Sequence, residues 1–316
     1  MLTHDQIQSF RTDGYLVVPD VVPLVTRDAV KEEYEGILDQ LCARWHAEGR
    51  ITTHPDRLES FWDKLQVGYD AGCDWFQPMD ISLPGDEITP DTPMHFGPAV
   101  FDLLRCEEIL DIVQSLIGPE ITSNPIQHVR IKPPARRLKG DEIRAHITAT
   151  DWHQDRGVGH AEADQTDMIT VWIAMTDATL ENGCLQVIPK AADKMLPHCP
   201  KVQTAIADDL IDETAAVPLP VPAGGVVLFH PLTPHASRVN LTDGFRWSFD
   251  LRYNVTGQPT GRAHFPEFIA RSAAAPETML TDWRRWRVMW EDARAALSKE
   301  PHIPIHRWQS DAPFCA

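Results

Sequence analysis

The prediction of the fold begins with residues 151–157, which read Asp-Trp-His-Gln-Asp-Arg-Gly. In an extended strand, side chains two residues apart point to the same side, so His153 and Asp155 are expected to project together. An imidazole beside a carboxylate supplies two members of the 2-His-1-carboxylate triad, which holds non-haem Fe(II) and leaves coordination positions open. Most His-x-Asp tripeptides, however, lie in surface strands or loops. The metal hypothesis therefore requires a second histidine.

Five histidines downstream are candidates for the missing ligand. They are His160, His198, His230, His235 and His264. His235 is the best placed, because the turn over 231–234, with a proline at each end, would aim its side chain from a strand edge into a barrel mouth. His230 is the competitor, although a histidine that ends an apolar strand is more often a satisfied core residue.

A ferrous triad needs two electrons to activate O2, and 2-oxoglutarate is their common donor. The far carboxylate of 2-oxoglutarate requires a buried cation, and the planar fork of arginine binds carboxylates through two hydrogen bonds. The predicted strand over 246–253 alternates polar and apolar residues, which puts Arg246, Asp250 and Arg252 on one side. Arg246 is the first choice for this carboxylate and Arg252 is the second. Alternatively, Asp250 and Arg252 form an inward pair that contacts the substrate.

The turns and strands of the sequence predict a mainly β protein with flanking helices. Short strands separated by turn signals follow a mainly helical N-terminal part, which favours a jelly roll or cupin-like barrel with helices packed outside. Strands are expected over 15–18, 121–132, 168–176, 184–188, 226–230 and 245–254, and helices over 3–13, 24–47, 98–117 and 282–297. Residues 1–316 are expected to form one domain whose β core spans about 121–255.

The composition excludes several classes of partner. The net charge of −17 would repel the phosphates of nucleic acids and anionic membranes. The basic stretch over 136–144 opposes this charge and is either a solvated loop or a surface that faces an anion. No apolar run approaches the length of a membrane span, and the N-terminus has no basic and apolar leader. The expected location is the cytoplasm, and the oligomeric state is left open.

The six cysteines form no Cys-x-x-Cys pair, and their spacing fits neither a disulfide scaffold nor a zinc knuckle. We therefore expect all six to be free thiols in a reducing compartment.

Several motifs, taken together, resemble the phytanoyl-CoA dioxygenase family of Fe(II)/2-oxoglutarate-dependent oxygenases. Their order and spacing extend over roughly residues 3–255. The motifs are the segment 8–19, Trp152-His153-Gln154-Asp155, Trp172-Ile173-Ala174 with Asp177, Glu181-Asn182-Gly183-Cys184-Leu185, the segment 224–230, and His235-Ala236-Ser237 with Asn240 and Arg246.

The resemblance implies a double-stranded β-helix in which His153, Asp155 and His235 hold the iron. It places the 2-oxoglutarate carboxylate on Arg246, eleven residues after the distal histidine. The resemblance further implies four residues near this cosubstrate, which are Gln154, Trp172, Ser237 and Lys132.

The activity implied by the resemblance is hydroxylation of a small-molecule or acyl substrate by O2, with release of succinate and CO2. Asp155 is present, whereas related halogenases lack this carboxylate, so hydroxylation is favoured over halogenation. Pro189-Lys190-Ala191-Ala192 departs from the Pro-Gly-Ser-His that is common in the family, so the substrate cannot be carried over from better-known members. The alternative is a cupin-like metal-dependent binding protein or isomerase that does not use 2-oxoglutarate.

Overall fold

The computed structural model describes residues 1–85, 87–137, 149–189, 194–200, 204–300, 307–309 and 311–315. Most of the basic stretch over 136–144 lies outside the described residues, as do parts of the loop over 190–216. The predicted roles of these stretches are therefore not addressed by the structure.

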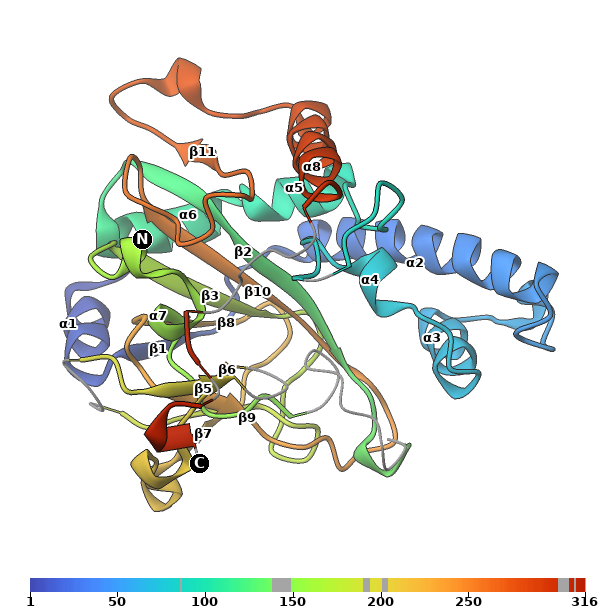
Figure 1. Cartoon of the computed structure of the whole chain (residues 1–316), viewed down its shortest axis with the longest axis horizontal. Coiled ribbons are helices and arrows are strands. Elements are labelled where there is room, and N and C mark those ends of the chain that lie inside the picture. The colour runs from blue at the N-terminus through green and yellow to red at the C-terminus, as the bar shows by residue number, and fades with distance from the viewer. Residues whose placement is uncertain are drawn as a thin grey trace.

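Two antiparallel sheets form the centre of the fold (Figure 1). The larger sheet has the strand order β1-β8-β3-β10-β2-β11, and the smaller has the order β7-β4-β9. The strands of the larger sheet are β1 (Tyr15–Val18), β2 (Ile121–Lys132), β3 (Met168–Ala174), β8 (Val226–Phe229), β10 (Arg246–Val255) and β11 (Phe268–Arg271). Those of the smaller are β4 (Leu185–Val187), β7 (Val217–Leu219) and β9 (His235–Ser237), and β5 (His198–Pro200) pairs separately with β6 (Thr204–Ile206). This architecture confirms the predicted jelly-roll fold with flanking helices.

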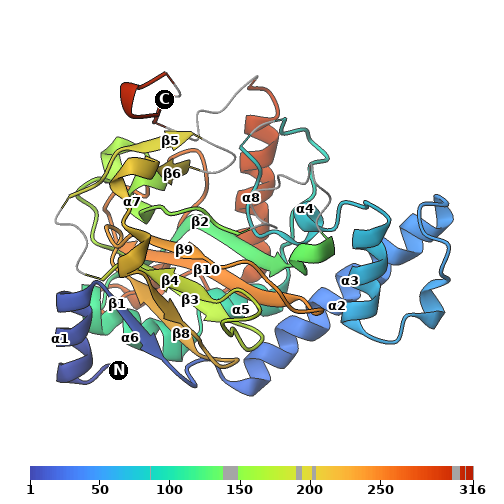
Figure 2. The ribbon, with the colours of Figure 1, turned by 90° about the horizontal axis from the view of Figure 1, so that it is seen from below.

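Helices cover the outer face of the larger sheet. Figure 2 shows α2, α5 and α6 along one side of the strands, with β5 and β6 on the other. The helices are α1 (His4–Asp13), α2 (Leu24–Ala47), α3 (Phe61–Asp70), α4 (Phe76–Met79), α5 (Pro98–Leu104), α6 (Glu107–Ile117), α7 (Asp155–Val158) and α8 (Trp283–Leu297). Apart from α7, which carries Asp155 on the inner side, these helices bury apolar side chains in the main hydrophobic core, whose members range from Leu2 to Leu297. The members of this core come from both ends of the chain, which is consistent with one domain over 1–316; the single domain stays a prediction.

The alternation of β10 determines the character of the two faces of the sheet. Trp247 and Phe249 point outward into the helical core and are almost fully buried. Arg246, Asp250 and Arg252 point to the opposite side, into the space between the sheets, and are also buried. The polar side of β10 therefore faces the barrel interior.

The helix predictions are confirmed at the N-terminus and need one correction. Thr3 and Gln6 form the predicted capping box of α1, and Gly14 ends the helix with a φ of 78°. The helix expected over 98–117 is instead two helices, because Cys106 is extended, with a ψ of 120°. The acidic residues Glu107 and Glu108 then occupy the first turn of α6, where they favour a helix start.

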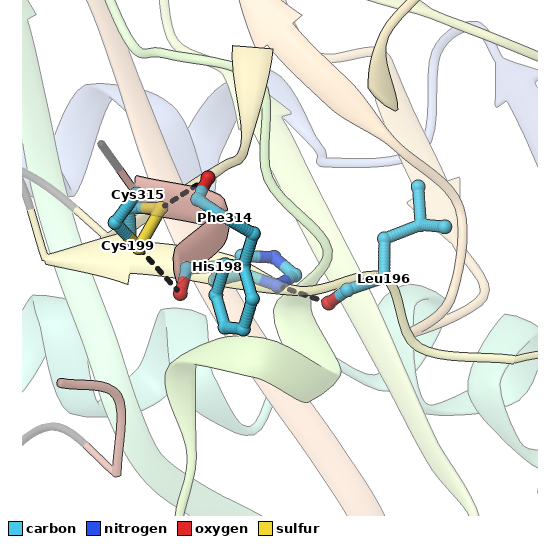
Figure 3. The surroundings of a disulfide bond; sticks show 5 residues. All are labelled: Leu196, His198, Cys199, Phe314 and Cys315. Carbon is cyan, nitrogen blue, oxygen red and sulfur yellow. Dashed lines mark hydrogen bonds between the residues drawn. A yellow bond between two sulfur atoms is a disulfide. The ribbon is translucent and has the colours of Figure 1, made fainter. Parts of the chain in front are cut away.

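The structure corrects the prediction that all six cysteines are free thiols. Cys199 in β5 and Cys315 near the C-terminus form a disulfide, with their Cα atoms 5.5 Å apart (Figure 3). The other four cysteines are free and buried. The bond joins positions separated by 116 residues, so it depends on a tertiary contact that local spacing motifs do not reveal. Within the described ranges, no helix is long and apolar enough to cross a membrane.

We expect the Cys199–Cys315 disulfide to be detectable by alkylation of the unfolded protein. Without reductant, four of the six cysteines should be labelled, and after reduction all six should be. Cys315→Ser should lower the free energy of unfolding by about 2–4 kcal/mol, because the unfolded chain loses its cross-link. Mass spectrometry and denaturant titration measure the two effects. Labelling of all six cysteines without reductant would contradict the disulfide.

Candidate metal site

The two predicted histidine ligands are neighbours in an antiparallel backbone bridge. His153 and His235 exchange both N–H···O hydrogen bonds, each 3.0 Å long. Their rings lie side by side with centroids 4.2 Å apart. His235 begins β9 after the predicted turn and pairs with Val187 of β4, which fixes its position in the smaller sheet. Phe229 stacks on the His235 ring, with the ring centroids 4.3 Å apart.

Asp155 lies beside the two histidines, but not on the strand that was expected to carry it. The predicted strand around His153 is only this single bridge, and Asp155 is the first residue of α7. Gln154 is extended, so the chain turns between the two ligands. Asp155 still contacts both imidazoles, with His153 Nε2 3.7 Å from one carboxylate oxygen and His235 Nε2 3.8 Å from the other. The candidate ligand atoms of the three residues all lie within 4.8 Å of one another, a geometry that can hold a metal ion.

Each imidazole is oriented by a backbone carbonyl. His153 Nδ1 is 2.8 Å from the carbonyl of Asp151, and His235 Nδ1 is 3.0 Å from that of Thr233. A carbonyl oxygen only accepts, so Nδ1 carries the hydrogen in both rings. The lone pair of a neutral ring is then on Nε2, which is the atom that faces Asp155.

The protonation states of the cluster suit a divalent cation. Burial, assisted by the neighbouring His235, lowers the pKa of His153 to about 3, so this ring is neutral at physiological pH. Burial alone would raise the pKa of Asp155, but Arg252 and the two imidazoles hold it below its ordinary value. A neutral imidazole and a charged carboxylate are the forms that ligate metal.

A small pocket lies beside the cluster and contains the first-choice arginine. Its lining includes His153, His235, Trp172, Ser237 and Arg246. The guanidinium carbon of Arg246 lies 5.1 Å from the centre of the Trp172 ring, and only 2% of the residue is exposed. Burial lowers the pKa of Arg246 to about 10, so it remains charged at neutral pH.

Arg246 has donors available for an anion. Among the described residues, its Nε and Nη1 have no hydrogen-bond partner. A buried cation with unsatisfied donors costs free energy unless an anion completes its hydrogen bonds. This observation fits the carboxylate of an acidic ligand.

Ser237 provides a further donor to the same pocket. Its hydroxyl oxygen accepts from Lys132 Nζ at 2.6 Å and from the backbone N–H of Thr150 at 2.8 Å. Both lone pairs are then in use, and the hydroxyl hydrogen is available for an anion. Lys132 is opposite Arg246 across β2 and β10, and burial together with Arg246 lowers its pKa well below the ordinary value. Lys132 thus supports Ser237 and does not itself line the pocket.

Gln154 is held away from the pocket. Its side-chain amide donates to the carbonyls of Leu232, at 2.6 Å, and Lys194, at 3.3 Å, and accepts from the N–H of Leu196, at 2.7 Å. This geometry gives no support to the predicted contact with a cosubstrate. Gln154 instead connects the segment 153–155, which carries two of the candidate ligands, to two neighbouring loops.

Two inward-facing residues were not identified from the sequence. Thr170 donates to Asp155, and Arg130 lies 3.4 Å from Asp250 at the pocket wall. The alternative in which Asp250 pairs with Arg252 is not supported, because Arg252 forms an ion pair with Asp155 and Asp250 forms one with Arg130. The alternation of β2 could have identified Arg130, because this residue pairs with Ser248, which lies on the inner side of β10.

The C-terminal segment packs against the residues that follow the ligand Asp155. Trp308 donates to the carbonyl of Gly157 at 2.8 Å and stacks on His198 with ring centroids 5.1 Å apart. His198 Nε2 in turn accepts from the backbone N–H of Gln154 at 3.0 Å. A Cβ atom at position 157 would lie 2.6 Å from the His198 ring, so this close approach requires glycine. His198 is therefore a support for the site and not a member of the metal cluster.

The remaining alternative ligand is excluded by its position. His230 is exposed, and its Nδ1 accepts from the N–H of Leu232 at 3.2 Å. His160 and His264 also lie outside the cluster.

Comparisons with known proteins identify related sequences. Residues 10–248 match the model of the phytanoyl-CoA dioxygenase family. The phytanoyl-CoA dioxygenase domain-containing protein 1 of Mus musculus is 35% identical over 269 residues, which cover 79% of this chain and 89% of that protein.

Solved structures show the same fold. The apo form of ThoJ, a non-heme monooxygenase, gives a TM-score of 0.56 at 22% identity and covers 94% of this chain and 99% of its own. The epimerase SnoN, solved with Fe3+, alpha ketoglutarate and nogalamycin RO, gives a TM-score of 0.52 at 18% identity, over 82% of this chain and 87% of its own.

We expect His235→Ala to abolish tight binding of Mn(II), because it removes one of three ligands. His230→Ala is the matched control, since it changes a histidine five residues away that lies outside the cluster, and it should bind Mn(II) like the unmodified protein. Isothermal titration calorimetry measures both affinities. Equal losses in the two variants would contradict the assignment of His235.

Proposed function

This chain belongs to the phytanoyl-CoA dioxygenase family, and from that premise we propose that it is an Fe(II)/2-oxoglutarate-dependent oxygenase. The observation that carries the proposal is the buried His153–Asp155–His235 cluster beside Arg246, whose donors are available to an anion. Each part fits one reactant. The three ligand atoms suit iron, and the guanidinium suits the far carboxylate of 2-oxoglutarate.

Iron(II) and 2-oxoglutarate, bound together, supply O2 activation coupled to decarboxylation of 2-oxoglutarate to succinate and CO2, with the second oxygen atom passing to the substrate. The protein contributes positioning. His153 and His235 present Nε2 because backbone carbonyls hold their Nδ1–H groups. Arg246 and Ser237 bind the far carboxylate, and the Trp172 ring holds the guanidinium in place. Burial of the cluster excludes bulk water from the reacting atoms.

The pocket supports this function over its rival. A cupin-like binding protein or isomerase would share the barrel and the metal ligands but has no need for a buried arginine with available donors. Arg246 therefore favours the oxygenase. SnoN is described as an epimerase, so hydroxylation as the outcome is a proposal to be decided by product analysis.

We further propose that the substrate presents a polar group at the metal, in preference to an alkyl chain. Arg130 and Asp250 form an ion pair in the lining of the same pocket. An alkyl chain packed on this pair would desolvate both charges and replace none of their hydrogen bonds. A hydroxyl or amine group would add hydrogen bonds to them.

The expected cytoplasmic location stays a proposal. The Cys199–Cys315 disulfide argues against it, because disulfides are rare in reducing compartments. The proposed partners are O2 and a small-molecule substrate. The net charge of −17 continues to argue against nucleic acid.

Anaerobic addition of Fe(II) and 2-oxoglutarate is expected to give a visible charge-transfer band. Arg246→Ala should raise the dissociation constant of 2-oxoglutarate by about tenfold or more, since a hydrogen bond to a charged group contributes about 1.5–3 kcal/mol. Arg238→Ala, which removes an exposed guanidinium next to Ser237, is the control and should leave this constant unchanged. A wild-type protein that binds metal but gives no band would favour the cupin-like alternative.

A substrate screen is expected to separate polar from acyl substrates. Succinate formation should rise above its substrate-free rate with hydroxylated or amine-bearing small molecules and not with phytanoyl-CoA. The product should gain one oxygen atom by mass spectrometry. Stimulation by phytanoyl-CoA would contradict the polar assignment while supporting the oxygenase.

A further inference from the structure

Both oxygens of the Asp155 carboxylate are held by fixed donors. Arg252 Nη2 donates to Oδ1, and Thr170 Oγ1 donates to Oδ2. All three side chains are buried, with 3% of the Arg252 side chain and none of the Asp155 side chain exposed. The orientation of this carboxylate is therefore set by protein contacts that exist independently of any metal.

The two donors come from neighbouring strands of the larger sheet. Arg252 of β10 is directly opposite Thr170 of β3 in the strand register. Both side chains project from the inner face, toward α7 and Asp155. Directly opposite residues have closely spaced side chains, so one cross-strand pair can donate hydrogen bonds to both oxygens of a carboxylate.

Arg252 is itself held by an irregularity in β2. The register between β10 and β2 shifts between Asp250 and Arg252, at a point where β2 contains Pro125. Proline has no N–H for the ladder, and a bulge leaves neighbouring backbone groups unpaired. The carbonyl of Ile126 thus accepts from Arg252 Nη1 at 3.0 Å. One terminal nitrogen of Arg252 is therefore fixed by the backbone of β2, and the other donates to Asp155.

The two buried arginines of β10 have separate tasks. Arg252 uses both terminal nitrogens on Ile126 and Asp155 and leaves only its Nε without a partner, whereas Arg246 has both Nε and one terminal nitrogen, Nη1, without a partner in the described part of the chain. Arg252 is thus a poor candidate for 2-oxoglutarate, although it was the second choice from the sequence.

We propose that Arg252 is a positioning residue for the metal ligand Asp155, with Thr170 as its partner. By fixing the plane of the carboxylate, the pair presents the same oxygen geometry to the metal in every molecule. The inference rests on the proposed metal site. A planar fork is required, because a lysine at 252 could place one charge near Asp155 but could not hold Ile126 and Asp155 in a fixed arrangement.

Metal titration tests the proposal without a substrate. Mn(II) affinity should fall by about 10–100-fold in Arg252→Gln, which is the range for residues that orient metal ligands. Arg252→Lys should recover part of this loss, and Thr170→Val should show a smaller loss than Arg252→Gln. Arg271→Gln is the matched control: Arg271 pairs with Glu107 and Asp111 away from the cluster, and the variant should retain full affinity.

The visible spectrum of Co(II) bound in place of iron provides the second readout, because it responds to ligand geometry and not to overall stability. Arg252→Gln and Thr170→Val should each shift this spectrum, and Arg271→Gln should not. Wild-type affinity and spectrum in Arg252→Gln would overturn the proposal.

If Arg252→Gln does not fold, Thr170→Val and Arg252→Lys test the proposal in its place. Wild-type Mn(II) affinity and a wild-type Co(II) spectrum in both variants would overturn the proposal. A wild-type protein that binds neither Mn(II) nor Co(II) would instead refute the metal site on which the proposed function rests.

Discussion

The site depends on the pair of backbone hydrogen bonds between His153 and His235. These bonds join two segments that are far apart in the sequence, and they set the two imidazoles side by side. Once the backbones are paired, the carbonyls of Asp151 and Thr233 determine which nitrogen of each ring faces inward. Asp155 reaches the same place because the chain turns into α7 immediately after Gln154. One short bridge thus determines the donor set.

The barrel interior has an unusual charge arrangement. Arg246, Asp250, Arg252, Asp155 and Lys132 are all buried there, although burial of isolated charges is costly. Most of this cost is offset by internal pairing, since Arg252 holds Asp155 and Asp250 contacts Arg130. Arg246 differs because its guanidinium lies over the face of Trp172, and its Nε and Nη1 have no hydrogen-bond partner among the described residues. Two basic side chains of this interior, Arg246 and Lys132, have no carboxylate partner among the described residues, and burial together with Arg246 lowers the pKa of Lys132.

Sequence periodicity predicted most elements of the fold. The capping box at Thr3, the strand β2 and the alternation of β10 follow from local propensity and pattern, and the structure bears them out. His235 was preferred over His230 because of the prolines around its turn, and His235 is the one in the cluster.

The remaining features depend on tertiary contacts that the sequence does not encode locally. The extended strand expected to carry both His153 and Asp155 is wrong, because Asp155 begins α7, where Arg252 and Thr170 donate hydrogen bonds to it. The disulfide escapes prediction because its two cysteines meet only in the folded chain.

The C-terminal segment has a practical consequence for handling this protein. Trp308 contacts Gly157 directly and reaches Gln154 through His198, so the last residues brace the segment that carries two of the three ligands. Shortening the chain before residue 307 would remove that brace while leaving every ligand in place. An affinity tag is therefore better placed away from the segment that carries Trp308.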